Sequence, residues 1–303
     1  MNVNTGKKIL VTGGTGLLAK GFVEMVPKDT EIICLHLRDY QVNDSLATYL
    51  SLDIRQKNLI DALFLKHKFD AVIHAAGIAS VDYVETNYAE SLESNIVGTL
   101  NITAACRKSG TYMVYVSTNA VFDGLTPPYS ENSTVGPINK YGRIKLECER
   151  LVQETLENYS IFRPILMYGC NHPMGRVNPA TWLLEQLRAG EIVHMVNDIY
   201  ENPVYNGQCG EALWKVVQKK PSGIFHIGGG EIVNRYEFAI QLAEVAGLDK
   251  NLIQPVESSY FTTIAERPRN TSFITDRMKQ ELGVKPLTIK EGLKLMLNIE
   301  GGY

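Results

Sequence analysis

Short apolar runs alternate with longer amphipathic segments through the first half of the chain. The apolar runs lie at residues 7–12, 31–37, 70–74, 112–117 and 159–163. Between them, apolar positions recur at helical spacing, as in residues 17–25, 56–67 and 89–108. Strands that are apolar throughout and alternate with helices are typical of a parallel sheet covered on both faces. The pattern predicts an α/β fold with a doubly wound sheet, strand order 3-2-1-4-5-6, and a ligand at the carboxyl ends of the strands.

The second half of the chain has a looser pattern. Helical stretches are predicted at residues 179–189, 210–219, 235–246, 276–282 and 290–298, with extended pieces at 192–196 and 223–227. We therefore expect two units, a nucleotide-binding domain over residues 1–165 and a smaller α/β lobe over residues 166–303 that closes over the substrate. Some elements of the second unit are expected to complete the main sheet.

A glycine-rich turn separates the first predicted strand from the first predicted helix. It reads Gly13-Gly14-Thr15-Gly16-Leu17-Leu18-Ala19, a G-x-x-G-x-x-A spacing. Glycine lets the backbone approach a pyrophosphate, and the helix N-terminus offers free N–H groups to the phosphates. A plain turn between strand and helix is the alternative. The flanking elements favour a Rossmann-type NAD(P) site whose contacts include Gly13, Thr15, Gly16, Leu17 and Leu18.

Tyr141 and Lys145 lie four residues apart in a predicted helix, and therefore on one face of it. A free phenol, with a pKa of about 10, transfers protons poorly at neutral pH. A neighbouring ammonium favours the phenolate and lowers that pKa. The pair is a candidate acid/base unit, although Tyr-x-x-x-Lys alone is a weak signal. At the end of the strand 112–117, the Thr118 hydroxyl is a candidate ligand for a carbonyl oxygen; the alternative is a turn that bonds its own backbone.

Composition adds mainly exclusions. The chain has 303 residues, of which 45% are hydrophobic and 21% charged, and a net charge of -3. This balance gives no reason to expect a nucleic acid or membrane partner. The five cysteines have no metal-ligand spacing, and no apolar run approaches the ~20 residues that span a bilayer. We expect a cytoplasmic protein with reduced thiols and no metal site.

In order and spacing, these segments resemble the extended short-chain dehydrogenase/reductase family, and within it the dTDP-4-dehydrorhamnose reductase branch. The similar segments cover nearly the whole chain: T-G-G-T-G-L-L-A at 12–19, D-I at 53–54, H-A-A-G at 74–77, N-I-V-G-T at 95–99, S-T-N-A-V-F-D-G at 117–124, Y-G-R-I-K at 141–145, F-R-P at 162–164, V-N-D-I-Y-E-N-P at 196–203 and E-R-P-R-N-T-S-F at 266–273.

The resemblance implies NAD(P)H-dependent reduction of the 4-keto group of a nucleotide-linked deoxysugar. Thr118 would orient the carbonyl, Tyr141 would supply the proton, and Lys145 would bind the nicotinamide ribose and lower the pKa of the tyrosine. The resemblance also implies further cofactor contacts, at Asp53 and Ile54 for the adenine and at Ala75, Ala76, Gly77 and Asn95. Asp53 has an alternative role as a helix N-cap, and Asn95 as a polar residue in helix packing.

Two positions depart from the branch, which usually shows S-T-D-Y-V-F where this chain has Asn119 and Ala120. Because these positions face the sugar in the family, the sugar need not be the rhamnose precursor. Dehydratases of the family carry T-D-E here, and the missing acids argue against dehydration. The bifunctional epimerase-reductases that make fucose carry a cysteine where Ala120 stands. A nucleotide-sugar 4-epimerase stays open, because it needs only the threonine, tyrosine, lysine and a tightly held NAD.

Cofactor choice depends on the end of the second strand, Leu35-His36-Leu37-Arg38. Arg38 and His36 are suited to a 2′-phosphate, which favours NADP over NAD; a solvated Arg38 is the alternative. Candidate substrate residues are Asn119, Ala120 and Val121 for the sugar, Arg267 and Arg269 (with Asn270) for the diphosphate, Arg176 and Asn178 in the same cleft, and Asn197 for the base.

For the arginines, a solvated basic loop is the alternative. Cys170 and His172 are interpreted as loop residues rather than a nucleophile pair. A relative of the reductase branch serves methionine adenosyltransferase as a regulatory subunit, so a non-catalytic cofactor-binding subunit is the alternative of another class. By analogy with the family, we expect a homodimer.

Overall fold

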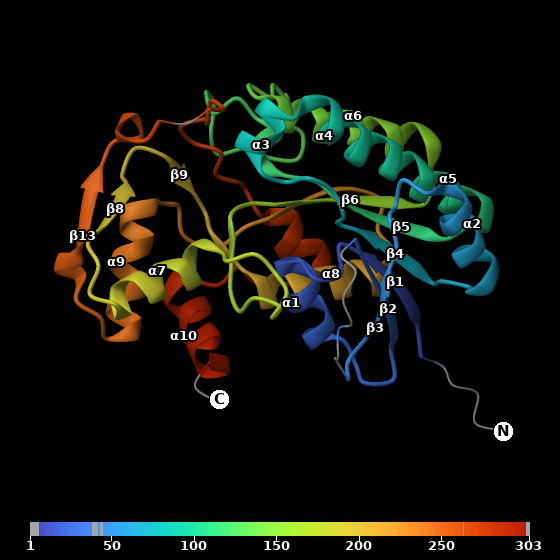
Figure 1. The fold of residues 1–303 in the computed structure, drawn as a ribbon, viewed down its shortest axis with the longest axis horizontal. Helices are drawn as coiled ribbons and strands as arrows, with labels where there is room; N and C mark the ends of the chain where they lie inside the picture. Colours follow the sequence, from blue (N-terminus) through green and yellow to red (C-terminus); the bar gives the residue numbers. More distant parts are fainter. Residues whose placement is uncertain (1–5, 38–41, 43–44, 263, 301–303) are drawn as a thin grey trace.

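The structure, a computed structural model, describes residues 6–37, 42, 45–262 and 264–300 (Figure 1). It has a large unit built on one sheet and a smaller lobe to the left of it in Figure 1. The sheet has seven strands, all parallel, in the order β11-β6-β5-β4-β1-β2-β3. Their bounds are β1 Lys8–Thr12, β2 Glu31–His36, β3 Thr48–Ser51, β4 Ala71–His74, β5 Tyr112–Val116, β6 Tyr159–Pro164 and β11 Gly223–Ile227.

The predicted order 3-2-1-4-5-6 is present, with β11 added beside β6. One strand of this sheet was missed. The edge strand β3 has half-exposed or exposed side chains, so it lacks the apolar run that predicts a buried strand. The run at 70–74 is consequently the fourth strand of the sheet and not the third.

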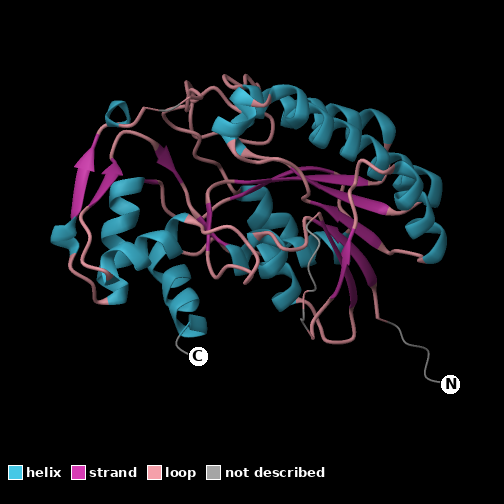
Figure 2. Ribbon diagram, in the orientation of Figure 1, coloured by secondary structure: helices cyan, strands magenta, loops and turns pink. Residues whose placement is uncertain are grey.

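Helices cover both faces of the sheet (Figure 2). Alternate residues of β1 show the two sides: Ile9 and Val11 pack in one core with α1 (Leu17–Met25) and α8 (Asn206–Lys219). Leu10 packs in the other core, which is completed by side chains of three helices, α2 (Lys57–Lys66), α5 (Gly98–Ser109) and α6 (Lys140–Thr155). The fold class is confirmed: a Rossmann-type doubly wound parallel sheet with a smaller C-terminal α/β lobe.

The segment between β4 and β5 is nearly all helical. After α3 (Val81–Thr86), α4 (Tyr88–Leu92) continues through a π-helical turn, η1 (Glu93–Val97), into α5. Asn95 is buried inside that turn. A π-turn within a helix displaces the side chains that follow it and is frequent at functional sites.

A third core forms the smaller lobe. It contains side chains of α7 (Pro179–Arg188), α9 (Arg235–Ala246), α10 (Ile289–Glu300), β8 (Val193–Val196) and β13 (Ile253–Val256). The remaining short elements are β7 Met167–Tyr168, β9 Tyr200–Glu201, β10 Val204–Tyr205, β12 Val233–Asn234, η2 Asn119–Val121, η3 Lys250–Leu252, η4 Ser258–Tyr260 and η5 Met278–Leu282.

The second half of the chain contributes to both parts of the molecule. Residues 206–227 supply α8 and β11 to the large unit, whereas α7, α9 and α10 form the smaller lobe. The division into 1–165 and 166–303 stays a prediction. In the described part of the chain, no helix is long and apolar enough to cross a membrane.

Candidate active site

A large cavity, about 1360 Å³ in volume, lies at the carboxyl ends of the strands. Its wall on the sheet side consists of residues that directly follow strands, among them Gly13 after β1, Ala75 after β4 and Ser117 after β5. The opposite wall comes from the smaller lobe, including Glu201 and Arg235. The cavity therefore lies where a doubly wound sheet is expected to bind its ligand.

The glycine-rich turn forms one end of this cavity. Gly13, Thr15, Gly16, Leu17 and Leu18 all line it. Gly16 is the N-cap of α1, and no side chain caps this end of the helix. The N–H groups of the first turn and the positive end of the helix dipole are thus available to a phosphate.

The backbone after β4 forms the next part of the wall, with Ala75, Ala76 and Gly77 all lining the cavity. Gly77 has a φ of 152°. A Cβ placed there would lie 2.2 Å from Oδ1 of Asn95. The Asn95 amide donates to the carbonyl of Ser91 at 2.8 Å. The buried asparagine thus packs where only a glycine fits and also lines the cavity, so the structure supports both interpretations of this residue.

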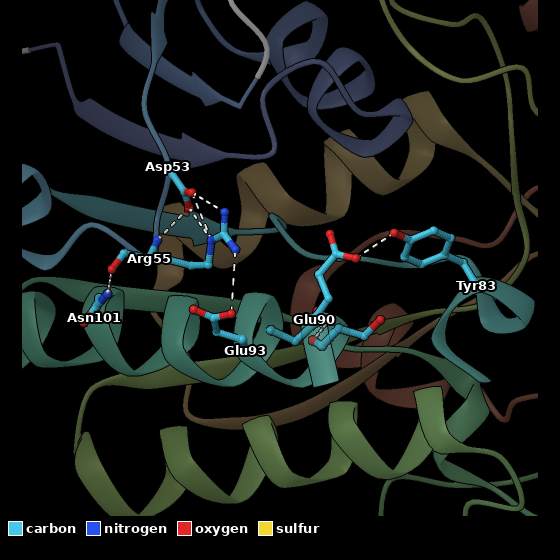
Figure 3. Close-up of polar contacts among 8 residues, drawn as sticks. Asp53, Arg55, Tyr83, Glu90, Glu93 and Asn101 are labelled. Atoms are coloured by element: carbon cyan, nitrogen blue, oxygen red, sulfur yellow. Dashed lines mark hydrogen bonds and ion pairs between the residues drawn. The ribbon is translucent and has the colours of Figure 1, made fainter. Parts of the chain in front are cut away.

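Asp53 and Ile54 line the cavity near the end of β3. The Arg55 guanidinium binds both carboxylate oxygens of Asp53, with its Nε 2.9 Å from Oδ2 (Figure 3). This hydrogen bond holds the pKa of Asp53 below its usual value. The backbone N–H of Arg55 also donates to Asp53, but the N-cap of α2 is Gln56, so the alternative role of Asp53 as the helix cap is wrong.

Figure 3 shows how this end of the cavity is tied to the helix below it. Arg55 also lies 4.0 Å from the Glu93 carboxylate, and Asn101 donates to the backbone carbonyls of Ile54 and Arg55. The Asp53–Arg55 pair and its backbone are thus held by contacts to η1 and α5.

Thr118, Tyr141 and Lys145 line the same cavity. Asn139 caps α6 by accepting the Gly142 N–H at 2.9 Å. A Cβ on Gly142 would lie 2.1 Å from the carbonyl oxygen of Ala120, so only glycine lets the helix pack this closely on the turn after Thr118. This contact brings the Tyr141 hydroxyl within hydrogen-bonding reach of Thr118.

Burial dominates the electrostatics of this group. It raises the pKa of Tyr141 to about 12, against a hydrogen bond from Thr118 that lowers it. Burial also lowers the pKa of Lys145 to about 8. The ammonium of Lys145 donates to the Val116 carbonyl at 2.6 Å and lies 4.3 Å from the centre of the Tyr115 ring. The expected lowering of the tyrosine pKa is thus wrong, because desolvation of the phenolate outweighs the hydrogen bond from Thr118.

A buried ion pair lies behind Lys145 and was not predicted. Glu149, one turn further along α6, accepts from Arg163 at 2.8 and 2.6 Å and from the Ser117 hydroxyl. Both charged side chains are almost fully buried. This cluster joins α6 to the ends of β5 and β6, and so fixes the strand end that carries Thr118. The glutamate four residues after the lysine was the signal available in the sequence.

On the opposite wall, Asn119 is bound by residues from two distant segments. Its amide donates to Glu201 at 3.1 Å and to Thr271 at 2.6 Å. Glu201 also lies 3.0 Å from the guanidinium of Arg235. None of Glu201, Thr271 and Arg235 was named as a site residue from the sequence, although Glu201 lies in the segment 196–203 and Thr271 in the segment 266–273. Their side chains meet only after β9 pairs with β12.

The predicted substrate residues divide into two groups. Asn119, Ala120, Arg176, Asn178, Arg267 and Arg269 line the cavity, whereas Val121 and Asn197 do not. Val121 is fully buried in the core. Asn197 donates its backbone N–H to Val256.

Asn178 caps α7, and its amide donates to the Gly169 carbonyl at 2.6 Å, so its polar atoms are already engaged. The two arginines predicted to bind the diphosphate, Arg267 and Arg269, are paired with carboxylates. Arg267 binds Asp82 of α3 at 2.9 Å, and Arg269 binds Asp198.

Several other predicted features have a clear place. Arg38 lies outside the described residues, whereas His36 lines the cavity at the end of β2. His172 is buried and accepts a hydrogen bond from the Met174 N–H, and Cys170 donates one to the Met296 carbonyl. These contacts agree with the interpretation of both as loop residues. Among the described residues, no group of three or more His, Cys, Asp or Glu side chains is arranged to hold a metal ion.

Comparison with known proteins extends this picture. Residues 7–300 match the family described as the RmlD substrate binding domain. A dTDP-4-dehydrorhamnose reductase of Aggregatibacter actinomycetemcomitans is 25% identical over 299 residues, which cover 95% of this chain and 97% of that protein. Methionine adenosyltransferase 2 subunit beta of Xenopus tropicalis is 26% identical over 257 residues, or 83% of this chain and 75% of that protein.

A solved structure has the same fold. The dTDP-4-dehydrorhamnose reductase of Bacillus anthracis in complex with NADP superimposes with a TM-score of 0.85 at 24% identity, covering 97% of this chain and 100% of that one. Both the sequence match and the fold therefore extend over nearly the whole chain.

Proposed function

The chain belongs to the RmlD substrate binding domain family, within the extended short-chain dehydrogenases/reductases, and on this premise we propose that it is an NAD(P)H-dependent reductase of nucleotide-linked 4-keto deoxysugars. The observation that carries the proposal is the meeting of Thr118, Tyr141 and Lys145 in one cavity with the glycine-rich turn. A reductase of this class needs a dinucleotide site and a proton donor that face the same substrate carbonyl.

Each of the three side chains has a role in the proposal. The nicotinamide, when bound, supplies the hydride to the sugar carbon. Thr118 donates a hydrogen bond to the carbonyl oxygen and holds it toward Tyr141. With a pKa of about 12, the phenol is fully protonated at neutral pH and gives its proton to the oxygen as negative charge develops there.

Lys145 supports this transfer through its charge. The ammonium is held in the cavity wall by the Val116 carbonyl, one helical turn from Tyr141. A positive charge at this distance stabilises the phenolate that remains after proton transfer. The same ammonium is placed to bind a ribose hydroxyl of the cofactor.

The cofactor fits the residues that line the sheet side of the cavity. An uncapped helix N-terminus faces the position of the phosphates, and Ala75, Ala76 and Gly77 line the same side of the cavity. We propose NADP as the preferred cofactor, supported by His36 at the end of β2 and by the similar fold of a reductase that binds NADP. A higher kcat/KM for NADPH than for NADH is the expected result, and a strong preference for NADH would contradict it.

The substrate diphosphate is assigned to Arg267 and Arg269, because both line the cavity mouth and a guanidinium matches two phosphate oxygens. Arg176 is a third candidate and lies close to the glycine-rich turn: a Cβ on the adjacent Gly175 would lie 3.0 Å from the Thr15 carbonyl oxygen. A homodimer and a cytoplasmic location stay predictions.

The direct test is oxidation of NADPH by the purified chain with a panel of dTDP-, UDP- and GDP-linked 4-keto-6-deoxyhexoses. We expect loss of the reduced cofactor with at least one of them, in proportion to the alcohol formed. Interconversion of two epimers without net loss of cofactor would favour the 4-epimerase instead.

A regulatory subunit is the second candidate, favoured by the similarity to methionine adenosyltransferase 2 subunit beta. The presence of the complete Thr118, Tyr141 and Lys145 set argues against it. Stoichiometric co-purification with a partner enzyme, together with no NADPH oxidation by any keto sugar nucleotide, would support the regulatory role.

A further inference from the structure

A continuous series of polar side chains leads from Thr118 across the substrate wall of the cavity. The Thr118 hydroxyl lies 3.3 Å from Oδ1 of Asn119, and Nδ2 of Asn119 lies 3.1 Å from Glu201. The other oxygen of Glu201 lies 3.0 Å from the Arg235 guanidinium. All four residues line the cavity, so a sugar whose carbonyl binds at Thr118 extends along this series.

Within the series, Asn119 has little capacity left for a ligand. Its two amide hydrogens are directed to Glu201 and Thr271. Its oxygen faces the Thr118 hydroxyl. Asn119 therefore positions Glu201, and the free capacity for binding lies at the next two residues.

Glu201 and Arg235 together offer both kinds of hydrogen bond. Nε of Arg235 is buried and has no hydrogen-bond partner among the described residues. Each carboxylate oxygen of Glu201 can accept more than one hydrogen bond. A hydroxyl group donates and accepts at once, so it satisfies a carboxylate and a guanidinium N–H together. A buried N–H without a partner costs free energy, which a ligand acceptor at this position would recover.

Local structure does not explain why an arginine stands at position 235. It is the first residue of α9, where the positive end of the helix dipole disfavours a cation. The helix already has a capping box, formed by Asn234 and Glu237. The antiparallel pairing of β9 with β12 places Val233 opposite Glu201 through the backbone. The ion pair is thus not needed to start the helix.

We propose that Glu201 and Arg235 bind a free hydroxyl on the sugar ring, next to the carbonyl held by Thr118 and Tyr141. The preferred substrate is then a 4-keto sugar nucleotide that keeps its 3-hydroxyl, and 3-deoxy sugars are disfavoured. This inference depends on the proposed function for the orientation of the carbonyl. It goes further by naming the substituent that the site selects and the residues that select it.

The test is a binding measurement that does not need turnover. The full chain loaded with oxidised cofactor is titrated calorimetrically with dTDP-4-keto-6-deoxyglucose and with its 3-deoxy counterpart. Because hydrogen bonds to charged groups are strong, we expect the wild type to bind the hydroxylated sugar about 10-fold or more tightly than the deoxy sugar. Glu201→Gln and Arg235→Met should each remove most of this difference by weakening the hydroxylated sugar alone.

A matched control is Glu244→Gln, which removes the carboxylate of an exposed ion pair with Lys250 and Lys290 in the same lobe. It should leave both dissociation constants unchanged. A purely structural role of the pair predicts that the Glu201 and Arg235 variants weaken both sugars equally, and that result overturns the inference.

Equal affinity of the wild type for the two sugars, or no binding of either, also overturns it. Wild-type turnover with NADPH, measured separately, decides the proposed function on its own.

Discussion

The two walls of the cavity are built in different ways. On the cofactor side, much of the wall comes from three short segments, residues 13–18, 53–55 and 75–78, each of which follows a strand. On the substrate side, the wall consists of side chains such as Asn119, Glu201 and Thr271, which are up to 152 positions apart in sequence.

This difference bears on how easily substitutions can change the ligand that each wall binds. A dinucleotide is bound through helix N–H groups and close backbone approach, which local motifs specify. A sugar is bound through side chains that substitution can exchange without altering the fold. The proposed catalytic residues lie where the two walls meet, at the end of β5 and the start of α6.

The largest effect is expected from a substitution of Tyr141, where the two walls meet. Tyr141→Phe should lower kcat by about 10³-fold, because the proton donor is lost, while the Kd for NADPH stays within about twofold. Tyr83→Phe is the matched control, since the exposed Tyr83 hydroxyl only donates to Glu90. Steady-state kinetics and fluorescence titration of the cofactor measure both quantities, and near-normal turnover of the Tyr141 variant would count against its role.

Substitution of a glycine in the cofactor wall should specifically weaken cofactor binding. Gly77→Ala places a Cβ 2.2 Å from Oδ1 of Asn95 at a φ of 152°, so the loop must move. We expect the Kd for NADPH to rise at least about 10-fold and the free energy of unfolding to fall by about 1–3 kcal/mol.

Gly110→Ala is the control for strain alone, because Gly110 has a φ of 69° and, apart from its chain neighbours, no atom of the described residues lies within 4 Å of its Cβ position. It should cost about 1 kcal/mol of stability and leave cofactor affinity unchanged. Equal effects of the two substitutions on cofactor affinity would show that the close approach at Gly77 is unimportant.

Substitutions in the substrate wall should change the KM for the nucleotide sugar. Arg267→Met removes a diphosphate ligand and should raise KM for the nucleotide sugar about 10-fold, with the cofactor Kd unchanged. Asp82→Asn should act in the opposite direction and lower KM by about two- to threefold, because the carboxylate that now binds Arg267 competes with the diphosphate. A rise in KM for both variants would mean that the Asp82–Arg267 pair itself forms the site.

The smallest expected effect is the pH dependence of the reduction rate, which tests Lys145 at the boundary between the walls. In the proposed mechanism, Lys145, whose pKa burial lowers to about 8, supports proton transfer only when it is charged. The rate of reduction should therefore fall as pH rises, reaching half its plateau value at a pH of about 8. A profile that stays flat to pH 10 would mean that the Lys145 charge does not contribute, because Tyr141 with a pKa of about 12 loses its proton only at higher pH.

The cofactor wall could be predicted from the sequence because its determinants are local. All described members of the predicted cofactor set line the cavity, from Gly13 to Lys145. Helix periodicity placed Tyr141 and Lys145 on one face, and strand ends placed Thr118 beside them. The expected pKa of Tyr141 was wrong, because burial depends on the packing of the whole site.

The substrate wall could be predicted only in part, because long-range pairing creates it. Glu201 and Arg235 approach each other through two strands of two residues each, too short to leave a pattern. Asn178 was predicted to line the substrate cleft; it does line the cavity, and its side chain also caps α7, a role that was not predicted from the sequence. The edge strand β3 escaped prediction for a related reason, since its half-exposed residues carry no hydrophobic signal.

The central claim is that this chain transfers a hydride from a nicotinamide to the carbonyl carbon of a nucleotide-linked sugar. The most direct measurement uses NADPH deuterated at the transferred position, with dTDP-4-keto-6-deoxyglucose and its UDP- and GDP-linked counterparts, followed by mass spectrometry of the sugar product. We predict one deuterium at C4 of the product for each reduced cofactor consumed. A sugar pool without deuterium, in the presence of bound and unconsumed NADPH, would contradict the account.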